Sequence, residues 1–207
     1  MSPSHFQSVP QLISGLGSIQ ELKILFTKQC YQHILIVTDA GMLQHQLHLP
    51  IIEILDKLQL HYSLYDAIQP DPSEAIIFAA VNFAKAQTVD LVLGFGGGSV
   101  LDVAKVIAIL AHPQQQQTLA DLYGIDQVQL PRLPLILVPT TAGTGSEVTP
   151  ISIVTTGETT KTGIVSPVLF ADVAILDATF TQYLPVVSLA ATGIDEMVPA
   201  IEAYTSK

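Results

Sequence analysis

The feature that most restricts the fold of this chain is a regular alternation of short β-branched apolar runs with longer stretches of helical periodicity. The alternating segments are, in chain order, residues 33–38, 49–58, 62–65, 73–86, 91–95 and 100–111. This pattern predicts the order strand, helix, strand, helix, strand, helix. Because a helical crossover returns the chain in its original direction, the strands are expected to be parallel. The sequence therefore predicts an α/β domain with a doubly wound parallel sheet.

Four later apolar runs predict additional short strands, at residues 135–138, 151–155, 161–165 and 173–176. Thr192, followed three residues later by Asp195, resembles a capping box and predicts a helix that begins at Thr192 and continues to Tyr204. The sequence stops just inside this amphipathic helix, which suggests a cut rather than a natural end. We therefore expect residues 1–184 to form the α/β domain and residues 185–207 to begin an all-helical domain that is mostly missing.

Charge and composition argue against several classes of partner. The 207 residues carry a formal net charge of −10 at pH 7 without a local cluster of Lys or Arg, which argues against nucleic acid and anionic membranes. No apolar run reaches the roughly 18 residues that span a bilayer, and the first residues lack the pattern of a signal peptide. The single cysteine, Cys30, cannot form an internal disulfide, so we expect a cytoplasmic protein.

The low share of charged residues predicts exposed apolar surface. Charged residues make up 13% of the chain, against roughly a quarter in an ordinary soluble domain. A contiguous apolar surface usually marks an interface, so we expect a homo-oligomer or the missing helical domain to cover it. The remaining class of partner for this acidic chain is a small molecule.

A glycine-rich loop between an apolar strand and a helix is the strongest local signal. Residues 94–105 read Gly-Phe-Gly-Gly-Gly-Ser-Val-Leu-Asp-Val-Ala-Lys. Glycines allow close backbone approach, and a helix N-terminus attracts phosphate, so Gly97, Gly98 and Ser99 are predicted to bind a pyrophosphate. Alternatively, Ser99 and Asp102 form a purely structural capping box. The loop is not a P-loop, because the Lys and hydroxyl residue that should follow the last glycine are absent.

A second loop with glycines and hydroxyl residues follows a later apolar strand. Residues 139–149 read Pro-Thr-Thr-Ala-Gly-Thr-Gly-Ser-Glu-Val-Thr. This composition suits a polar ligand that lies against the backbone, although such a loop can also be a plain connector. Two loops of this kind after parallel strands favour a ligand, because ligands of open α/β sheets bind at the carboxyl ends of the strands.

Asp39 closes the first expected strand and is a candidate for binding a ribose. Its carboxylate would accept hydrogen bonds from ribose hydroxyls and repel the 2′-phosphate of NADP, so NAD is favoured over NADP. In the common Rossmann fingerprint the acidic residue follows the glycines by about 20 residues, whereas Asp39 precedes them. Alternatively, Asp39 only initiates a turn before Gly41.

The histidines do not indicate a metal site. All six lie between His5 and His112, and none stands with a carboxylate in a metal-binding signature. His45 and His48 can share a helix face, but a solvated pair is the favoured interpretation. No Ser-His-Asp or Cys-His arrangement indicates a nucleophile, which fits an enzyme whose cofactor carries the hydride chemistry.

Five blocks of sequence together resemble the iron-containing (group III) alcohol dehydrogenases. They occupy residues 96–105, 139–149, 161–166, 172–177 and 191–195, in the order of that family. A Gly15-x-Gly17 turn near the start adds to the resemblance, which covers essentially the whole chain and roughly the N-terminal half of a family member. It implies a Rossmann-like dinucleotide domain followed by an all-helical domain, with a metal in the cleft between them.

The resemblance implies oxidation of alcohols or reduction of aldehydes with NAD(P), assisted by iron or sometimes zinc on one Asp and three His residues. The metal would act as a Lewis acid on the alcohol oxygen while hydride passes to the nicotinamide. Together with Asp102 of the glycine-rich block, the positions that match the family's cofactor contacts are Asp39, Asp71, Gly97, Gly98, Ser99, Thr140, Thr141, Thr144 and Lys161. No catalytic side chain is identified in this chain.

The chain departs from the family at the metal-binding helix, which usually reads Gly-x-Asp-x-x-x-His. Asp195 is present, but Pro199 occupies the position of the first His, and proline neither binds a metal nor suits a helix interior. Asp195 is thus a remnant, expected to cap a helix here, and this chain is not expected to bind the metal. Two alternatives stay open: a non-catalytic dinucleotide-binding module or decayed relative, and an oxidoreductase with an electrophile other than a metal.

Overall fold

The computed structural model describes residues 6–157, 159–182 and 186–205, without the side chains of residues 186–189, 191, 195, 196 and 199. Its main body is a six-stranded sheet of order β1-β9-β6-β4-β2-β3, in which all pairings are parallel. The strands are β1 (Gln11–Ser14), β2 (His33–Val37), β3 (His61–Tyr65), β4 (Leu91–Gly96), β6 (Leu135–Pro139) and β9 (Val173–Leu176). The predicted doubly wound parallel sheet is confirmed, with β1 as an unpredicted edge strand.

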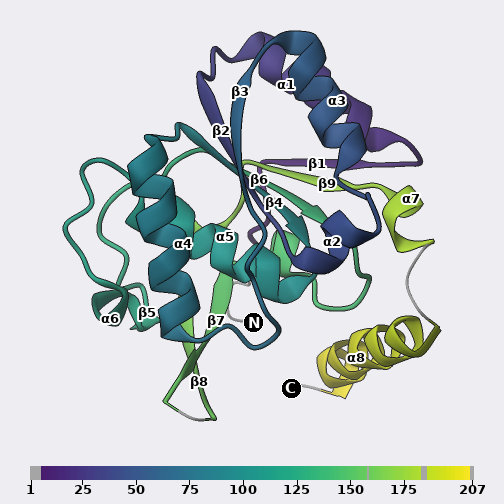
Figure 1. The fold of residues 1–207 in the computed structure, drawn as a ribbon. Helices are drawn as coiled ribbons and strands as arrows, with labels where there is room; N and C mark the ends of the chain where they lie inside the picture. The colour runs from purple at the N-terminus through teal and green to yellow at the C-terminus, as the bar shows by residue number, and fades with distance from the viewer. Residues whose placement is uncertain (1–5, 158, 183–185, 206–207) are drawn as a thin grey trace.

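Helices cover both faces of the sheet (Figure 1). α4 (Glu74–Gln87) and α5 (Gly98–Leu110) pack on one face, and α1 (Leu22–Lys28) and α3 (Leu49–Leu58) pack on the other. The short helices are η1 (Ser18–Glu21), α2 (Ala40–Gln44), α6 (Leu119–Leu122), η2 (Ser146–Val148), η3 (Pro167–Leu169) and α7 (Ala178–Thr181). The three helices expected in the first half of the chain are therefore present.

Strand β2 shows how the sequence builds two cores. Ile34 and Ile36 belong to the cluster under α1 and α3, whereas Leu35 and Val37 belong to the cluster under α4 and α5. Successive strand side chains point to opposite faces, and all four are fully buried. A continuous apolar run is therefore required here, as in other strands that are covered on both sides.

Helix α5 is buried from Val100 to Leu110, because it contacts β4 and β6 as well as a second sheet. This sheet has the order β5-β8-β7 and consists of β5 (Gly124–Ile125), β7 (Ile151–Thr156) and β8 (Thr160–Val165). Gly94 permits the close packing of α5, since a Cβ at this position would lie 2.8 Å from both Ala104 Cβ and Leu137 Cδ2. The expected strands at 151–155 and 161–165 exist and form an antiparallel pair in this second sheet.

Helix α8 (Val186–Thr205) lies below α7 in Figure 1 and begins earlier than expected. The prediction of a start at Thr192 is wrong, because the preceding residues continue the helical pattern and place Thr192 and Asp195 inside the helix. The expected role of Asp195 as a helix cap is therefore also wrong. The helix continues through Pro199, whose nitrogen has no hydrogen for the carbonyl of Asp195. None of the described helices is long and apolar enough to cross a membrane.

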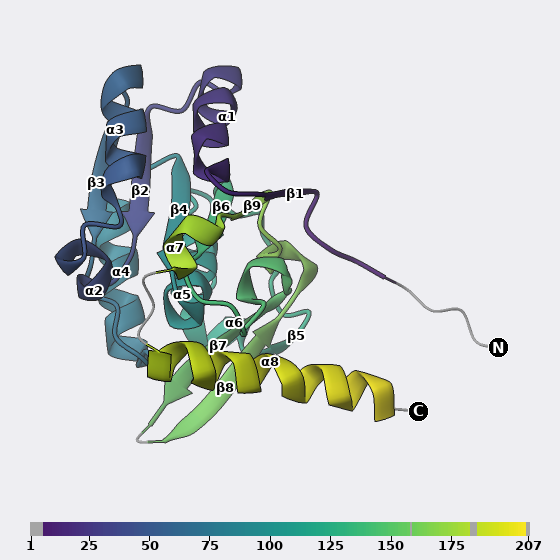
Figure 2. The ribbon, with the colours of Figure 1, turned by 90° about the vertical axis from the view of Figure 1, so that its right-hand side faces the viewer.

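Strand β1 forms one edge of the sheet, next to β9 (Figure 2). A buried carboxylate holds this edge in place. Asp177, which directly follows β9, accepts hydrogen bonds from the backbone N–H groups of Gly17 and Ile19, both at 3.0 Å. It also accepts the N–H of Thr179 at 3.0 Å and the Thr179 hydroxyl at 2.7 Å. Burial opposes ionisation of Asp177, but the bonds from Ile19, Thr179 and Gly17 outweigh it and hold its pKa below the usual value.

Candidate functional site

A cleft opens at the carboxyl ends of β4 and β6, where both glycine-containing loops leave the sheet. It consists of two cavities of about 590 and 600 Å³. Both cavities are lined by Gly98, Ser99 and Thr144, so they lie next to each other and together make up the cleft. The first cavity extends to Asp39, and the second extends to Lys161. The two glycine-containing loops thus lie together at the carboxyl ends of their strands, as the sequence led us to expect.

The N-terminus of α5 presents free backbone N–H groups to the cleft. Gly97 occupies the N-cap position without a side-chain hydrogen bond, and Leu101 N–H makes the bond to Gly97 O at 3.1 Å. The N–H groups of Gly98, Ser99 and Val100 have no acceptor within the helix, and all three residues line the cleft. The positive end of the helix dipole adds to the attraction for an anion. The proposed capping box of Ser99 and Asp102 is wrong, because Ser99 lies inside the helix.

The two loops pack directly against each other. A Cβ at Gly98 would lie 2.8 Å from Thr144 Cγ2, and one at Gly97 would lie 3.5 Å from Thr141 Oγ1. Glycine at position 98 is therefore needed for the close approach of the second loop. Thr141 and Thr144 line the cleft, as the sequence analysis expected of a ligand-binding loop.

Thr140 occupies a different position from its neighbour Thr141. It is 1% exposed and does not line either cavity of the cleft. Its N–H donates to Gly96 O at 3.0 Å, which joins the two loops, and its hydroxyl is buried without a hydrogen-bond partner among the described residues. Thr140 therefore lies beneath the cleft and connects its two loops.

Asp39 is the N-cap of α2 and also lines the cleft. Its Oδ1 accepts the N–H of Gly41 at 2.8 Å and the N–H of Met42 at 3.1 Å. Asp39 thus begins a short helix before Gly41, where the sequence suggested a turn. Both bonds end on Oδ1, which leaves Oδ2 without a hydrogen bond from any residue of the described ranges. The capping role fixes the carboxylate and still leaves one oxygen for a ligand.

Asp71 and Lys161 meet at the other end of the cleft although 90 residues separate them. Their side chains form an exposed ion pair, with Lys161 Nζ 2.5 Å from Asp71 Oδ1. Asp71 has a positive φ of 51°, and the next residue, Pro72, accepts the N–H of Thr155 at 3.0 Å. The turn at Asp71 is therefore attached to β7, which pairs with the strand that carries Lys161.

Asp102 and Lys105, both on α5, form a buried ion pair that contacts β7. Lys105 Nζ lies 3.3 Å from Asp102 Oδ1, and the Lys105 side chain is fully buried. Burial raises the pKa of Asp102, and attraction to Lys105 partly opposes this rise. Burial lowers the pKa of Lys105, and attraction to Asp102 partly opposes this fall. Lys105 was not among the site residues predicted from the sequence. The signal for it was a single cation within an apolar helix.

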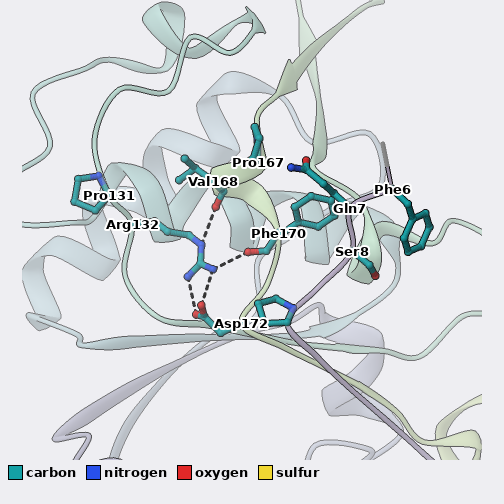
Figure 3. A pocket seen from close by; sticks show the side chains of 10 residues that line it. Phe6, Gln7, Ser8, Pro131, Arg132, Pro167, Val168, Phe170 and Asp172 are labelled. Atoms are coloured by element: carbon teal, nitrogen blue, oxygen red, sulfur yellow. Dashed lines mark hydrogen bonds and ion pairs between the residues drawn. The ribbon is translucent and has the colours of Figure 1, made fainter. Parts of the chain in front are cut away.

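A third cavity, of about 670 Å³, lies at the opposite end of the sheet (Figure 3). Arg132 and Asp172 line it, next to the first residues of β6 and β9. The guanidinium makes two hydrogen bonds to the Asp172 carboxylate and one to each carbonyl of Leu133, Val168 and Phe170. All five N–H donors are used, so Arg132 joins chain segments and has no donor left for a ligand.

The model of the family described as iron-containing alcohol dehydrogenase matches residues 10–178. The chain belongs to this family. It is 37% identical over 198 residues to sulfoacetaldehyde reductase of Bilophila wadsworthia and 39% identical over 193 residues to long-chain-alcohol dehydrogenase 1 of Geobacillus thermodenitrificans. These matches cover 95% and 93% of the chain but 51% and 49% of the relatives. The chain thus spans about half the length of these curated relatives.

Solved structures of the family share this fold. Sulfoacetaldehyde reductase of Bifidobacterium kashiwanohense, solved in complex with NAD⁺, matches with a TM-score of 0.91 and 28% identity over 100% of this chain and 55% of its own. A 1,3-propanediol oxidoreductase matches with a TM-score of 0.90 and 27% identity over 97% of this chain and 52% of its own. The resemblance identified from the sequence is confirmed.

The described residues do not form a complete site for the metal of the family. They contain no group of three His, Cys, Asp or Glu side chains that is able to hold a metal ion. The side chains of Asp195 and Pro199 lie outside the description, and proline offers no ligating atom. The donor set of the described residues does not fit the metal.

Proposed function

We propose that this chain is the dinucleotide-binding half of an NAD-dependent alcohol dehydrogenase or aldehyde reductase. The observation that carries the proposal is the N-terminus of α5, where three N–H groups face a cleft between two loops. A pyrophosphate fits such a seat, because it matches the free donors and the helix dipole. We assign it to the N–H groups of Gly98, Ser99 and Val100, with Gly97 providing the extended backbone before them.

The rest of the cleft divides into two sides around this seat. We assign a ribose to the Asp39 side, and the remainder of the dinucleotide to the side of Asp71 and Lys161. Thr141 and Thr144 complete the wall, and Thr140 supports it from beneath. When bound, the nicotinamide gives or accepts the hydride. The chain's own part is to hold the dinucleotide against the backbone, next to a site for a small alcohol or aldehyde.

The state of Asp39 supports a preference for NAD. Two backbone N–H groups hold its carboxylate in place, so it is unable to turn away from a 2′-phosphate. Like charges that face each other across an interface disfavour the wrong partner, whereas the free Oδ2 suits a ribose hydroxyl donor. The solved relative from Bifidobacterium kashiwanohense holds NAD⁺.

Helix α8 supports the division into residues 1–184 and the beginning of a second domain at 185–207. Several of its apolar side chains are exposed, among them Ile194 at 65%, Met197 at 61% and Tyr204 at 91%. An apolar helix side of this kind normally packs against further protein. We propose that it faces the helical half of the whole enzyme or a second copy of the chain, and that this half completes the substrate site.

The test is titration with NADH and, separately, NADPH, followed by cofactor fluorescence. We expect saturable NADH binding and about tenfold weaker NADPH binding, which corresponds to about 1.4 kcal/mol. Asp39→Asn keeps an oxygen that caps α2 but removes the charge. It should therefore reduce the difference between the NADH and NADPH affinities, mainly by strengthening NADPH binding. Asp56→Asn, at an exposed position of α3, is the matched control and should change neither affinity. Absence of saturable binding of either dinucleotide would refute the proposed function.

A further inference from the structure

Lys105 has no contact with solvent, yet its ammonium group is well supplied with partners. Nζ donates to the carbonyl of Ile151 at 2.6 Å, to Thr149 Oγ1 at 3.4 Å and to Asp102 Oδ1 at 3.3 Å. These three acceptors come from β7, from the end of the second loop and from α5. A buried ammonium is stable only with such partners, since an isolated charge in the interior is strongly disfavoured.

Asp102 is one turn of α5 below the proposed pyrophosphate seat. It follows Ser99 by three residues, so both lie on one side of the helix, and both line the second cavity of the cleft together with Gly98. Its Oδ2 accepts the N–H of Ile153 at 3.0 Å, and its backbone carbonyl accepts the Ser152 hydroxyl at 3.0 Å. A carboxylate thus faces the space that the cofactor is proposed to occupy.

A negative charge at this position conflicts with binding an anion. Asp102 is 8% exposed, so water screens its charge poorly, and a pyrophosphate close by would be repelled. The other charged groups around Asp102 are Lys105 on α5, Glu147 on η2, and the Asp71–Lys161 pair, whose charges largely cancel. Lys105 is the charge that directly contacts the Asp102 carboxylate.

We propose that Lys105 is a positioning residue that neutralises Asp102 and joins β7 and the second loop to α5, so that the cleft accepts the negatively charged pyrophosphate. This inference rests on the proposed function. It assigns to the buried pair an electrostatic task in cofactor binding, besides its contribution to packing. Asp102 itself holds β7 in place through Ile153, which explains why a carboxylate is present so close to an anion seat.

The test compares the NADH affinity of three variants between pH 5.5 and 8.5. Lys105→Met keeps the length of the side chain but leaves Asp102 unpaired, so NADH binding should weaken at least tenfold at pH 8. Loss of Lys105 raises the pKa of Asp102 further, because the strongest influence that opposes burial is removed and only the hydrogen bonds from Ile153 and Ser146 still lower it. Affinity should therefore recover as the pH falls and Asp102 becomes neutral. The double variant Lys105→Met, Asp102→Asn should bind NADH within about threefold of the original chain at every pH.

Lys57→Met is the matched control, because Lys57 forms an exposed i,i+4 pair with Glu53. It should leave the affinity and its pH dependence unchanged. Equal weakening of Lys105→Met at all pH values, or a double variant as weak as the single one, would overturn the inference and indicate a packing role alone. If Lys105→Met does not fold, as judged by circular dichroism, the NADH affinity of the double variant decides. Binding within about threefold of the original chain supports the inference, and weaker binding overturns it. Failure of the original chain to bind NADH would instead refute the proposed function, and this inference with it.

Discussion

The replacement Asp177→Asn should destabilise the protein through loss of a charge that four hydrogen bonds surround. Asp177 Oδ1 accepts bonds from Gly17 and from both donors of Thr179, and Oδ2 accepts the N–H of Ile19. An Asn oxygen is able to replace Oδ1, but its amide group would then face the N–H of Ile19. One buried donor is left unsatisfied, and three bonds to a charged acceptor become bonds to a neutral one.

The expected loss follows from these contacts. An unsatisfied buried donor costs about 1–3 kcal/mol, and bonds to a neutral acceptor are roughly half as strong as bonds to a charged one. Contributions within one hydrogen-bond network are not additive, so we expect a total loss of about 2–4 kcal/mol in the free energy of unfolding. For a chain of this size each kcal/mol shifts Tm by about 2–4 °C, so Tm should fall by about 4–16 °C at pH 7.

The assay is thermal unfolding followed by circular dichroism as a function of pH. The pKa of Asp177 is lower in the folded than in the unfolded state, so its charge stabilises the fold above the unfolded pKa of about 4. This contribution is lost as the pH falls through the folded pKa, and the difference in Tm between the two proteins should shrink there. Asp121→Asn, which changes an exposed carboxylate bonded only to Thr118, is the control with the smaller effect. Equal Tm values for Asp177→Asn and the original chain at pH 7 would refute this reasoning.

Two further replacements test the packing of α5 and the role of Arg132. Gly94→Ala places a Cβ 2.8 Å from Ala104 and Leu137, so overpacking should cost about 1–3 kcal/mol and lower Tm, whereas Gly163→Ala, with its nearest contact at 3.7 Å, should not. An unchanged Tm for Gly94→Ala would contradict the close packing. Arg132→Lys should lower Tm, because a lysine ammonium group is unable to replace the five hydrogen bonds of the guanidinium. It should not change the NADH affinity, because the cavity that Arg132 lines is separate from the cleft. A weakened NADH affinity at unchanged Tm would argue against a structural role.

Much of the sheet could be predicted from the sequence because its central strands are buried on both sides. The runs around Leu35 and Leu93 are apolar at every position and therefore visible without knowledge of their neighbours. Strand β1 was missed for the opposite reason. Its residues are mostly exposed and its partner, β9, lies far along the chain, so its strand conformation depends on a long-range pairing that local patterns do not contain.

The site was predicted where it depends on backbone chemistry and missed where it depends on packing between distant segments. The glycines before α5 indicated a helix N-terminus with free N–H groups, but the same sequence also allowed a capping box of Ser99 and Asp102. The start of the helix at Gly98 decides between these two interpretations. The signal for Lys105 in the sequence was weak, because its partners Thr149 and Ile151 come from a distant loop and from the second sheet. The early start of α8 was missed because a capping pattern at Thr192 also fits within a helix.

The placement of β1 has a consequence for the order in which the protein is made. Among the described strands its only neighbour in the sheet is β9, and the bonds from Gly17 and Ile19 reach a carboxylate up to 160 positions away. Strand β1 therefore has no partner in this sheet until β9, the last of its described strands, has been synthesised. Such non-local pairing forms slowly, and the short length of β1 limits its pairing with other chains during this interval.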